Sequence, residues 1–235
     1  MPALFKAERS PRLSLKPVPG VDMALDHGPL FPTEEWTFSS LAHRGYDVIV
    51  ADPPWRFMAW SKKGVNQKSP GAHYETMRIE DIAALPVAEL ARPAGALLLM
   101  WATSPMLPAQ LEVMKSWGFA YNSQIIWRKI YESGKIRMGT GYRIRGCHEI
   151  VIVGKRGKVP RARTVRSIFD GVGRNRRPGE ESQHSRKPME FWPHVEPIFP
   201  GAKRWCELFS RQSTTLESGI RVEPWGNEVG KFDDG

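Results

Sequence analysis

Cysteine is scarce in this chain, with Cys147 and Cys206 the only two among 235 residues. Two cysteines cannot build a disulfide framework, and no Cys/His spacing typical of a metal site surrounds them. Long apolar runs are also missing, since the run at residues 95–102 is too short to cross a bilayer. The N-terminus shows no apolar core followed by a cleavage site. The composition predicts a reduced, cytoplasmic globular protein without a metal.

Positive charge is concentrated in one segment. Residues 155–187 hold eleven Lys and Arg against three Asp and Glu, so they carry +8 of the chain's formal charge of +9. Basic runs are usually solvated surface segments. Here the excess of arginine over lysine and the interspersed glycines favour a loop that grips phosphate oxygens, because a guanidinium matches the geometry of a phosphate. We therefore expect contact with a nucleic acid.

The remaining organisation is that of an α/β protein. Residues 1–45 show no sustained period and are rich in proline, which predicts an irregular N-terminal extension. Residues 46–235 are expected to form a single domain with basic loop insertions near 131–146 and 155–183. Strands and helices alternate there, and several strands are apolar throughout, which indicates a mostly parallel sheet covered by helices on both faces.

The expected elements can be given by residue range. Strands are expected at residues 46–55, 95–103, 120–129, 147–157 and 202–211, helices at 78–93, 105–119 and 187–199, and a terminal turn at 219–231. Neither a glycine-rich dinucleotide fingerprint after a strand nor a P-loop pattern occurs. The fold class therefore has to be linked to chemistry through other motifs.

The stretch ADPPW, residues 51–55, places an acid at the end of an apolar strand. In open α/β sheets ligands bind beyond the carboxyl ends of the strands, so Asp52 is expected at a ligand-binding edge. Pro53 and Pro54 restrict the backbone on either side and lack N–H groups. We expect the Pro53 carbonyl to be a free acceptor next to the Asp52 carboxylate, with Trp55 offering a flat apolar face.

Two acceptors and an aromatic plane match an exocyclic amino group on a planar heterocycle. Hydrogen bonds from that amine to Asp52 and to the Pro53 carbonyl draw electron density onto its nitrogen, which can then attack an electrophilic methyl group. Positioning and electrostatics are sufficient for this step, and Asp52 need not be a strong base. The alternative is a plain strand-ending turn in which the acid caps the backbone and the tryptophan packs in the core.

An ordered set of motifs extends this interpretation. ADPPW, HYETM, LLLMWAT, IIWRK, GCHEIVIVGKRG, HSRKP, CELFSR and WGNEV occur in the order typical of the MT-A70 family of adenine-N6 methyltransferases. The chain resembles a compact bacterial or phage member of that family over residues 46–231. The resemblance implies a Rossmann-like methyltransferase fold that binds S-adenosyl-L-methionine (SAM).

The resemblance also implies roles for individual residues. The catalytic positions that it implies are Asp52, Pro53, Pro54, Trp55 and Tyr74. It implies that Lys187 holds the methionine carboxylate of the cofactor. Glu207 and Arg211 match the ribose site, where a surface ion pair is the alternative, and Asn227 matches the residue that reads the cofactor adenine. Glu228 stands where the eukaryotic catalytic member has glutamine. Trp101 and Glu149 are expected to line the pocket, with packing in the core or capping of a strand end as the alternatives.

Basic residues of the two loops are expected to form a cationic rim that binds the substrate backbone. The residues assigned to it are Arg143, Arg145, Arg161, Arg163 and Arg166. Such contacts position a strand, while the pocket reads the base. We expect DNA rather than RNA as the polymer. The alternatives are an RNA adenine-N6 methyltransferase, a non-catalytic nucleic-acid-binding relative, and a methyltransferase for an amine on a small molecule or protein.

Overall fold

The computed structural model describes residues 36–55, 76–139, 143–159, 163–173 and 186–233. Its strands are β1 (Val48–Ala51), β2 (Gly95–Ala102), β3 (Ala120–Ile130), β4 (His148–Gly157), β5 (Ile168–Val172), β6 (Trp205–Leu208), β7 (Thr214–Thr215) and β8 (Arg221–Trp225). Its α-helices are α1 (Ile79–Ala83), α2 (Leu107–Ser116) and α3 (Phe191–Val195), with short 3₁₀ helices at Val87–Glu89, Ser104–Met106 and Glu196–Ile198. No helix among the described residues is long and apolar enough to span a membrane.

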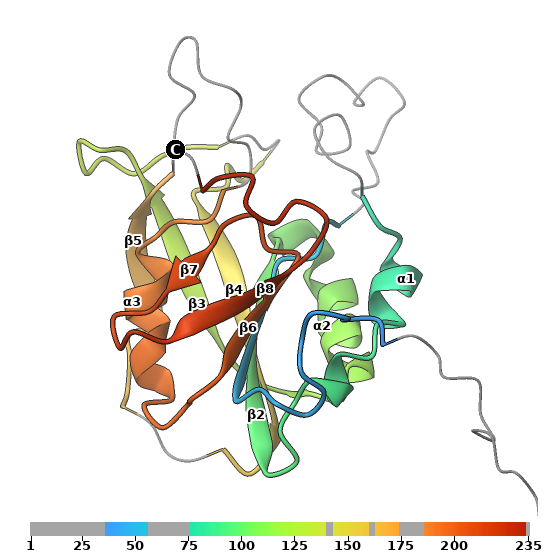
Figure 1. Ribbon diagram of the computed structural model, residues 1–235. Helices are drawn as coiled ribbons and strands as arrows, with labels where there is room; N and C mark the ends of the chain where they lie inside the picture. The colour runs from blue at the N-terminus through green and yellow to red at the C-terminus, as the bar shows by residue number, and fades with distance from the viewer. Residues whose placement is uncertain (1–35, 56–75, 140–142, 160–162, 174–185, 234–235) are drawn as a thin grey trace, which may run out of the picture. The chain divides into compact units, whose positions relative to one another are not determined.

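The strands form one sheet in the order β5-β3-β4-β2-β1-β6-β8-β7 (Figure 1). Strand β1 pairs in parallel with both β2 and β6, and β6 pairs in parallel with β8. Strand β4 is antiparallel to β2 and β3, and β7 is antiparallel to β8. The other strands therefore all run in one direction, which confirms the mostly parallel α/β sheet expected from the sequence.

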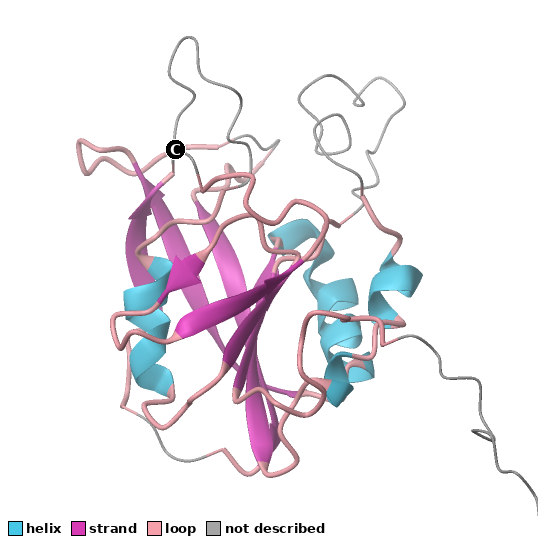
Figure 2. Ribbon diagram, in the orientation of Figure 1, coloured by secondary structure: helices cyan, strands magenta, loops and turns pink. Residues whose placement is uncertain are grey.

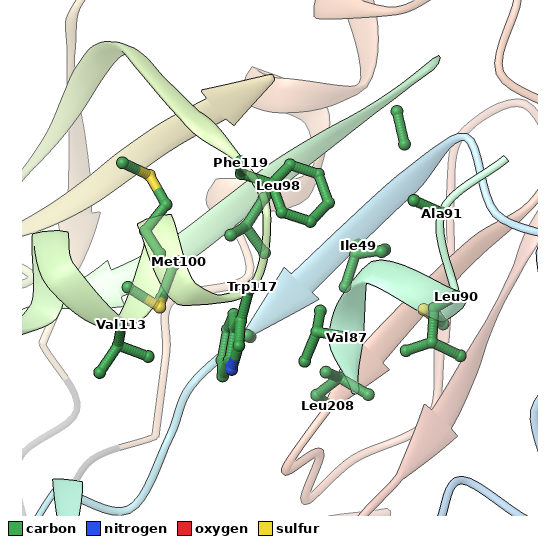
Figure 3. Packing of buried hydrophobic residues seen from close by; sticks show 14 of the residues in the cluster. Ile49, Val87, Leu90, Ala91, Leu98, Met100, Val113, Trp117, Phe119 and Leu208 are labelled. Atoms are coloured by element: carbon green, nitrogen blue, oxygen red, sulfur yellow. The ribbon is translucent and has the colours of Figure 1, made fainter. Parts of the chain in front are cut away.

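Helices cover both faces of the sheet (Figure 2). Helices α1 and α2 lie over one face and α3 over the other. Successive residues of a strand point to opposite faces, so neighbouring residues of β1 pack against different helices. In β1, Ile49 packs in the cluster that includes residues of α1 and α2, whereas Val48 and Val50 pack in the cluster that includes α3. Figure 3 shows the first cluster, in which Ile49, Leu98 and Trp117 lie close together.

The sequence-based boundaries need three corrections. Residues 219–231 were expected to be a terminal turn, but Arg221–Trp225 form β8, which pairs with β6. The expected basic loop at 155–183 contains β5, which pairs with the end of β3. Within the expected N-terminal extension, Phe38 and Leu41 are buried in the core. Local composition did not predict these structures, because they depend on pairing with distant strands and on contacts in the core.

Candidate active site

Asp52 lies directly after β1, at the carboxyl edge of the sheet. Its backbone N–H donates to the Leu208 carbonyl at 3.3 Å, so the acid is tied to the end of β6, the neighbouring parallel strand. The Pro54 carbonyl accepts the backbone N–H of Met77 at 2.9 Å, which fixes the two prolines against the segment that leads into α1. The corner is therefore held at both ends by backbone hydrogen bonds.

A cavity of about 380 Å³ opens beside this corner. Its lining residues are Asp52, Pro53, Pro54, Thr76, Met77, Phe209, Arg211, Trp225, Gly226, Asn227 and Glu228. The sequence assigned roles to six of these residues. It missed Thr76, Met77, Phe209, Trp225 and Gly226, although all of them lie within the quoted motifs HYETM, CELFSR and WGNEV.

Gly226 shows why the cavity has this shape. The chain must turn sharply after β8, and Gly226 has φ +152°. A Cβ at this position would lie 2.9 Å from the Phe209 Cα, so only glycine allows the two backbone segments to approach so closely. This approach brings the ends of β6 and β8 together beside Asp52. Asn227 and Glu228 follow at the cavity wall.

A network of buried charges lies behind the acidic corner. The Lys187 Nζ is 3.0 Å from Asp52 Oδ1 and 3.3 Å from Glu149 Oε2, and it lies 5.1 Å from the centroid of the Trp101 ring. Lys129 Nζ is 2.5 Å from the other oxygen of Glu149. Glu149 therefore forms ion pairs with both lysines, and Lys187 also forms an ion pair with Asp52. The sequence had left open whether Glu149 lines the pocket or is part of the core.

The pKa shifts follow from this network. Burial alone would raise the pKa of Glu149, but attraction to Lys187 and Lys129 outweighs burial and holds it at about 2. Burial opposes the charged form of Lys187, yet the charges of Asp52 and Glu149 raise its pKa above the ordinary value. Both shifts favour the charged forms of Glu149 and Lys187 at neutral pH.

Glu207 has the opposite character. It is 7% exposed, on β6, and accepts a hydrogen bond from the Ser210 hydroxyl at 2.7 Å. Burial raises its pKa to about 7, the Ser210 hydrogen bond lowers it in part, and the charge of Asp52 raises it further. Arg211 lines the cavity and its Nη2 lies 3.9 Å from Asp52 Oδ2. Glu207 is not among the residues that line the cavity, although Phe209 and Arg211, two and four residues after it, are. A buried carboxyl with a raised pKa is a candidate functional group.

Two features of the corner differ from the expectation. The Pro53 carbonyl accepts the backbone N–H of Trp55 at 2.8 Å, so it is not a free acceptor, although a carbonyl oxygen can accept a second hydrogen bond. Trp55 is 4% exposed and packs in the core, rather than presenting a flat face to the cavity. Its indole nitrogen is buried and has no hydrogen-bond partner among the described residues. Tyr74 lies outside the described residues.

The arginines assigned to the substrate rim are placed as follows. Arg143, Arg145, Arg163 and Arg166 are exposed, and Arg161 lies outside the described residues. Arg145 Nε donates to the Gly139 carbonyl at 3.0 Å, and the Arg166 carbonyl lies 2.8 Å from His194 Nε2. None of the four described arginines lines the cavity. Within the described part of the chain, no group of His, Cys, Asp and Glu residues has the arrangement of a metal site.

Comparison with known proteins agrees with this geometry. The profile of the MT-A70 family matches residues 46–228, which span the sheet from β1 to the cavity wall after β8. The chain belongs to the MT-A70 family. Methyltransferases of the MT-A70 family use SAM as methyl donor.

Individual relatives differ in how much of them the chain covers. A type II methyltransferase, M.MunI of Mycoplasma, is 26% identical, and the alignment covers 84% of this chain and 83% of the relative. An N6-methyladenosine RNA methyltransferase of Cryphonectria parasitica is 27% identical over 80% of this chain and 52% of its own length. A putative MT-A70-like N(6)-adenosine-methyltransferase of Medicago truncatula is 29% identical over 72% of this chain and 25% of its own length.

Proposed function

We propose that this MT-A70 protein transfers a methyl group from SAM to the N6 amino group of adenine in a nucleic acid, with DNA as the preferred polymer. The observation that carries the proposal is the position of Asp52 and the Pro53 carbonyl at the wall of a cavity that Asn227 and Arg211 also line. A carboxylate and a carbonyl that can hold an amine, next to side chains that can hold a cofactor, support amine methylation better than a non-catalytic nucleic-acid-binding role.

The described residues fit the cofactor. The cavity combines apolar walls from Phe209 and Trp225 with the amide of Asn227, which complements the donor and acceptor edge of an adenine. Glu207 would accept hydrogen bonds from the ribose hydroxyls, Arg211 would bind beside it, and Lys187 would hold the methionine carboxylate. When bound, SAM supplies an electrophilic methyl group on a sulfonium.

Asp52 can bind the substrate amine although it contacts Lys187. Its Oδ1 is occupied by the lysine at 3.0 Å, but a carboxylate offers about four acceptor sites on its two oxygens. Oδ2, 3.9 Å from Arg211, can accept one hydrogen of the amine, and the second lone pair of the Pro53 carbonyl can accept the other. This arrangement would hold the amine with its nitrogen lone pair directed towards the methyl group that a bound sulfonium donor would supply. Asp52 Oδ2 would hold the N–H whose proton is released to solvent once the nitrogen carries the methyl group.

One comparison supports DNA over RNA. The alignment covers most of the Mycoplasma type II methyltransferase, whereas it covers about half of the fungal RNA methyltransferase. The rim arginines would bind the phosphates of either polymer, because phosphate contacts carry little sequence information. The pocket would read the adenine, which has to leave a duplex before its N6 becomes accessible.

The test is transfer of tritiated methyl groups from SAM to single-stranded DNA, duplex DNA and RNA of one sequence, followed by nucleoside analysis. We expect label in N6-methyladenine, and more of it in DNA than in RNA. Asp52→Ala should abolish transfer while calorimetry still detects cofactor binding. Glu112→Ala removes an exposed carboxylate of α2 that does not line the cavity, and it should leave transfer unchanged. The proposal would be contradicted if no polymer were labelled, or if the label were found in a nucleoside other than N6-methyladenine.

A further inference from the structure

In the loop between β3 and β4, the described residues 131–139 and 143–147 include exposed apolar side chains that phosphate binding does not require. Among the described residues, eight large hydrophobic side chains are exposed, and half of them lie in this loop: Tyr131, Ile136, Met138 and Ile144. Ile144 has the highest exposed fraction of these, 86%. A loop that only contacted phosphates would need its basic residues alone.

The loop also has the charge of a nucleic-acid contact. It carries Lys135, Arg137, Arg143 and Arg145 against one acid, Glu132. Ile144 stands between two exposed arginines. An aliphatic side chain flanked by cations suits a partner that offers phosphates and apolar base faces within a few ångströms of each other.

Backbone contacts hold the described parts of the loop in place. Gly139 N–H donates to the Gly146 carbonyl at 2.8 Å, and Arg145 Nε donates to the Gly139 carbonyl at 3.0 Å. A Cβ on Gly139 would lie 2.5 Å from the Gly146 oxygen, so glycine is needed for this closure. Arg137 donates from Nη1 to the Gly173 carbonyl at 3.0 Å, which ties the loop to the end of β5.

The loop starts at the same sheet edge as Asp52. It follows the carboxyl end of β3 and precedes the start of antiparallel β4, and it projects beyond the sheet in Figure 1. Ile144 is five residues from Glu149, a path of at most roughly 17 Å. Glu149 in turn contacts Lys187 at 3.3 Å, and Lys187 contacts Asp52. Ile144 is thus within reach of the nucleotides next to a target base in the pocket.

We propose that Ile144 is a wedge that enters the base stack of a duplex and fills the space that the target adenine leaves, while Arg143 and Arg145 hold the flanking phosphates. Apolar wedges of this kind separate base steps in other nucleic-acid-binding proteins. The proposal rests on the proposed function, and it makes duplex DNA a substrate. Single-stranded DNA does not need the wedge, because its bases are already accessible.

The experiment compares the wild-type protein with Ile144→Ser, Ile144→Phe and Tyr121→Ser. Tyr121 is 51% exposed near the start of β3, at the opposite sheet edge, so it is a matched control. Methyl transfer is measured on one oligonucleotide as a single strand, a matched duplex and a duplex with a mismatch at the target adenine. The rate of methyl transfer by Ile144→Ser should fall roughly tenfold on the matched duplex, fall less on the mismatched duplex and stay unchanged on the single strand. Ile144→Phe and Tyr121→Ser should behave like the wild type.

Other outcomes would overturn the wedge. These are an equal loss of Ile144→Ser activity on single strands and duplexes, or no loss on any substrate. They are also a wild-type protein that methylates single strands but no duplex, or a loss that coincides with a change in mass by light scattering, which would mark a self-association surface. A second measurement does not depend on turnover: 2-aminopurine at the target position of a duplex should brighten on binding to the wild type and not to Ile144→Ser. Failure of the proposed function would differ, since transfer to single strands would then also be absent.

Discussion

Replacement of Lys187 by methionine tests the charge network behind the active site most directly. Methionine keeps an unbranched side chain against Trp101 but removes the charge that lies 3.0 Å from Asp52 and 3.3 Å from Glu149. The three side chains are only 14% to 19% exposed. Removal of one partner from a buried ion pair costs about 3–5 kcal/mol. We expect the lower end, about 3 kcal/mol, because Lys129 still neutralises Glu149.

The loss should be measured by urea unfolding at pH 7.5, with Lys203→Met as the control for an exposed lysine. A double-mutant cycle isolates the pair. Asp52→Asn in the Lys187→Met protein removes the carboxylate that has lost its nearest cation, with only Arg211 at 3.9 Å remaining, and it leaves Glu149 with Lys129. It should therefore recover about 1–2 kcal/mol. The same change in the wild type should lower stability. A Lys187→Met loss below about 0.5 kcal/mol, or additive losses in the cycle, would refute the reasoning.

The pH dependence provides an independent check. The pKa of Glu149 is about 2 in the folded chain and 4.5 in the unfolded reference, so its contribution to stability is present above pH 4.5 and is lost as pH falls towards 2. Lys187 is one of the two lysines that cause this shift. The stability difference between wild type and Lys187→Met should therefore shrink from pH 5 to pH 3. A constant difference across that range would contradict the assigned pairing.

Two further predictions concern cofactor binding. Arg211 stacks on Phe232 at 5.2 Å from the ring centroid, and the Phe232 N–H donates to the Arg211 carbonyl at 3.0 Å, so Phe232→Leu should weaken SAM binding roughly tenfold by calorimetry with little change in fold by circular dichroism. Glu207, with its pKa raised by burial to about 7, should bind the ribose as the carboxylate, so SAM affinity should rise roughly tenfold from pH 6 to pH 8. Glu207→Gln should abolish that rise, and an unchanged pH profile would refute the role.

The sequence predicted the acidic corner because every signal there is local. An apolar run that ends in an acid and two prolines specifies a strand end and a stiff turn without reference to the rest of the chain. The structure places Asp52 at that edge, beside the cavity. Asn227 and Arg211 reach the same cavity, although they were assigned through family motifs rather than through local pattern.

The features that the sequence did not predict depend on contacts between distant segments. The hydrogen bond to the Pro53 carbonyl and the burial of Trp55 depend on how the turn packs against the core. Strand β8 was interpreted as a turn because Pro224 and two glycines dominate its local composition, whereas its pairing with β6 is set by the sheet. Pro224 is tolerated there because β7 pairs only with Arg221 and Val222, so Pro224 lies beyond the part of β8 that pairs with β7 and need not donate a hydrogen bond on that side.

The pairing of Lys187 with Asp52 has a consequence for the order of events at the site. If Lys187 holds the cofactor carboxylate, as the family resemblance implies, its three donors must be shared among that group, Glu149 and Asp52. Glu149, anchored by Lys129, keeps the ammonium at the site whichever of the other two carboxylates it contacts. A bound cofactor would then draw the ammonium partly away from Asp52 and leave more of that carboxylate for the substrate amine. Cofactor binding should therefore strengthen binding of the target adenine, and Glu149 is the residue on which this coupling depends.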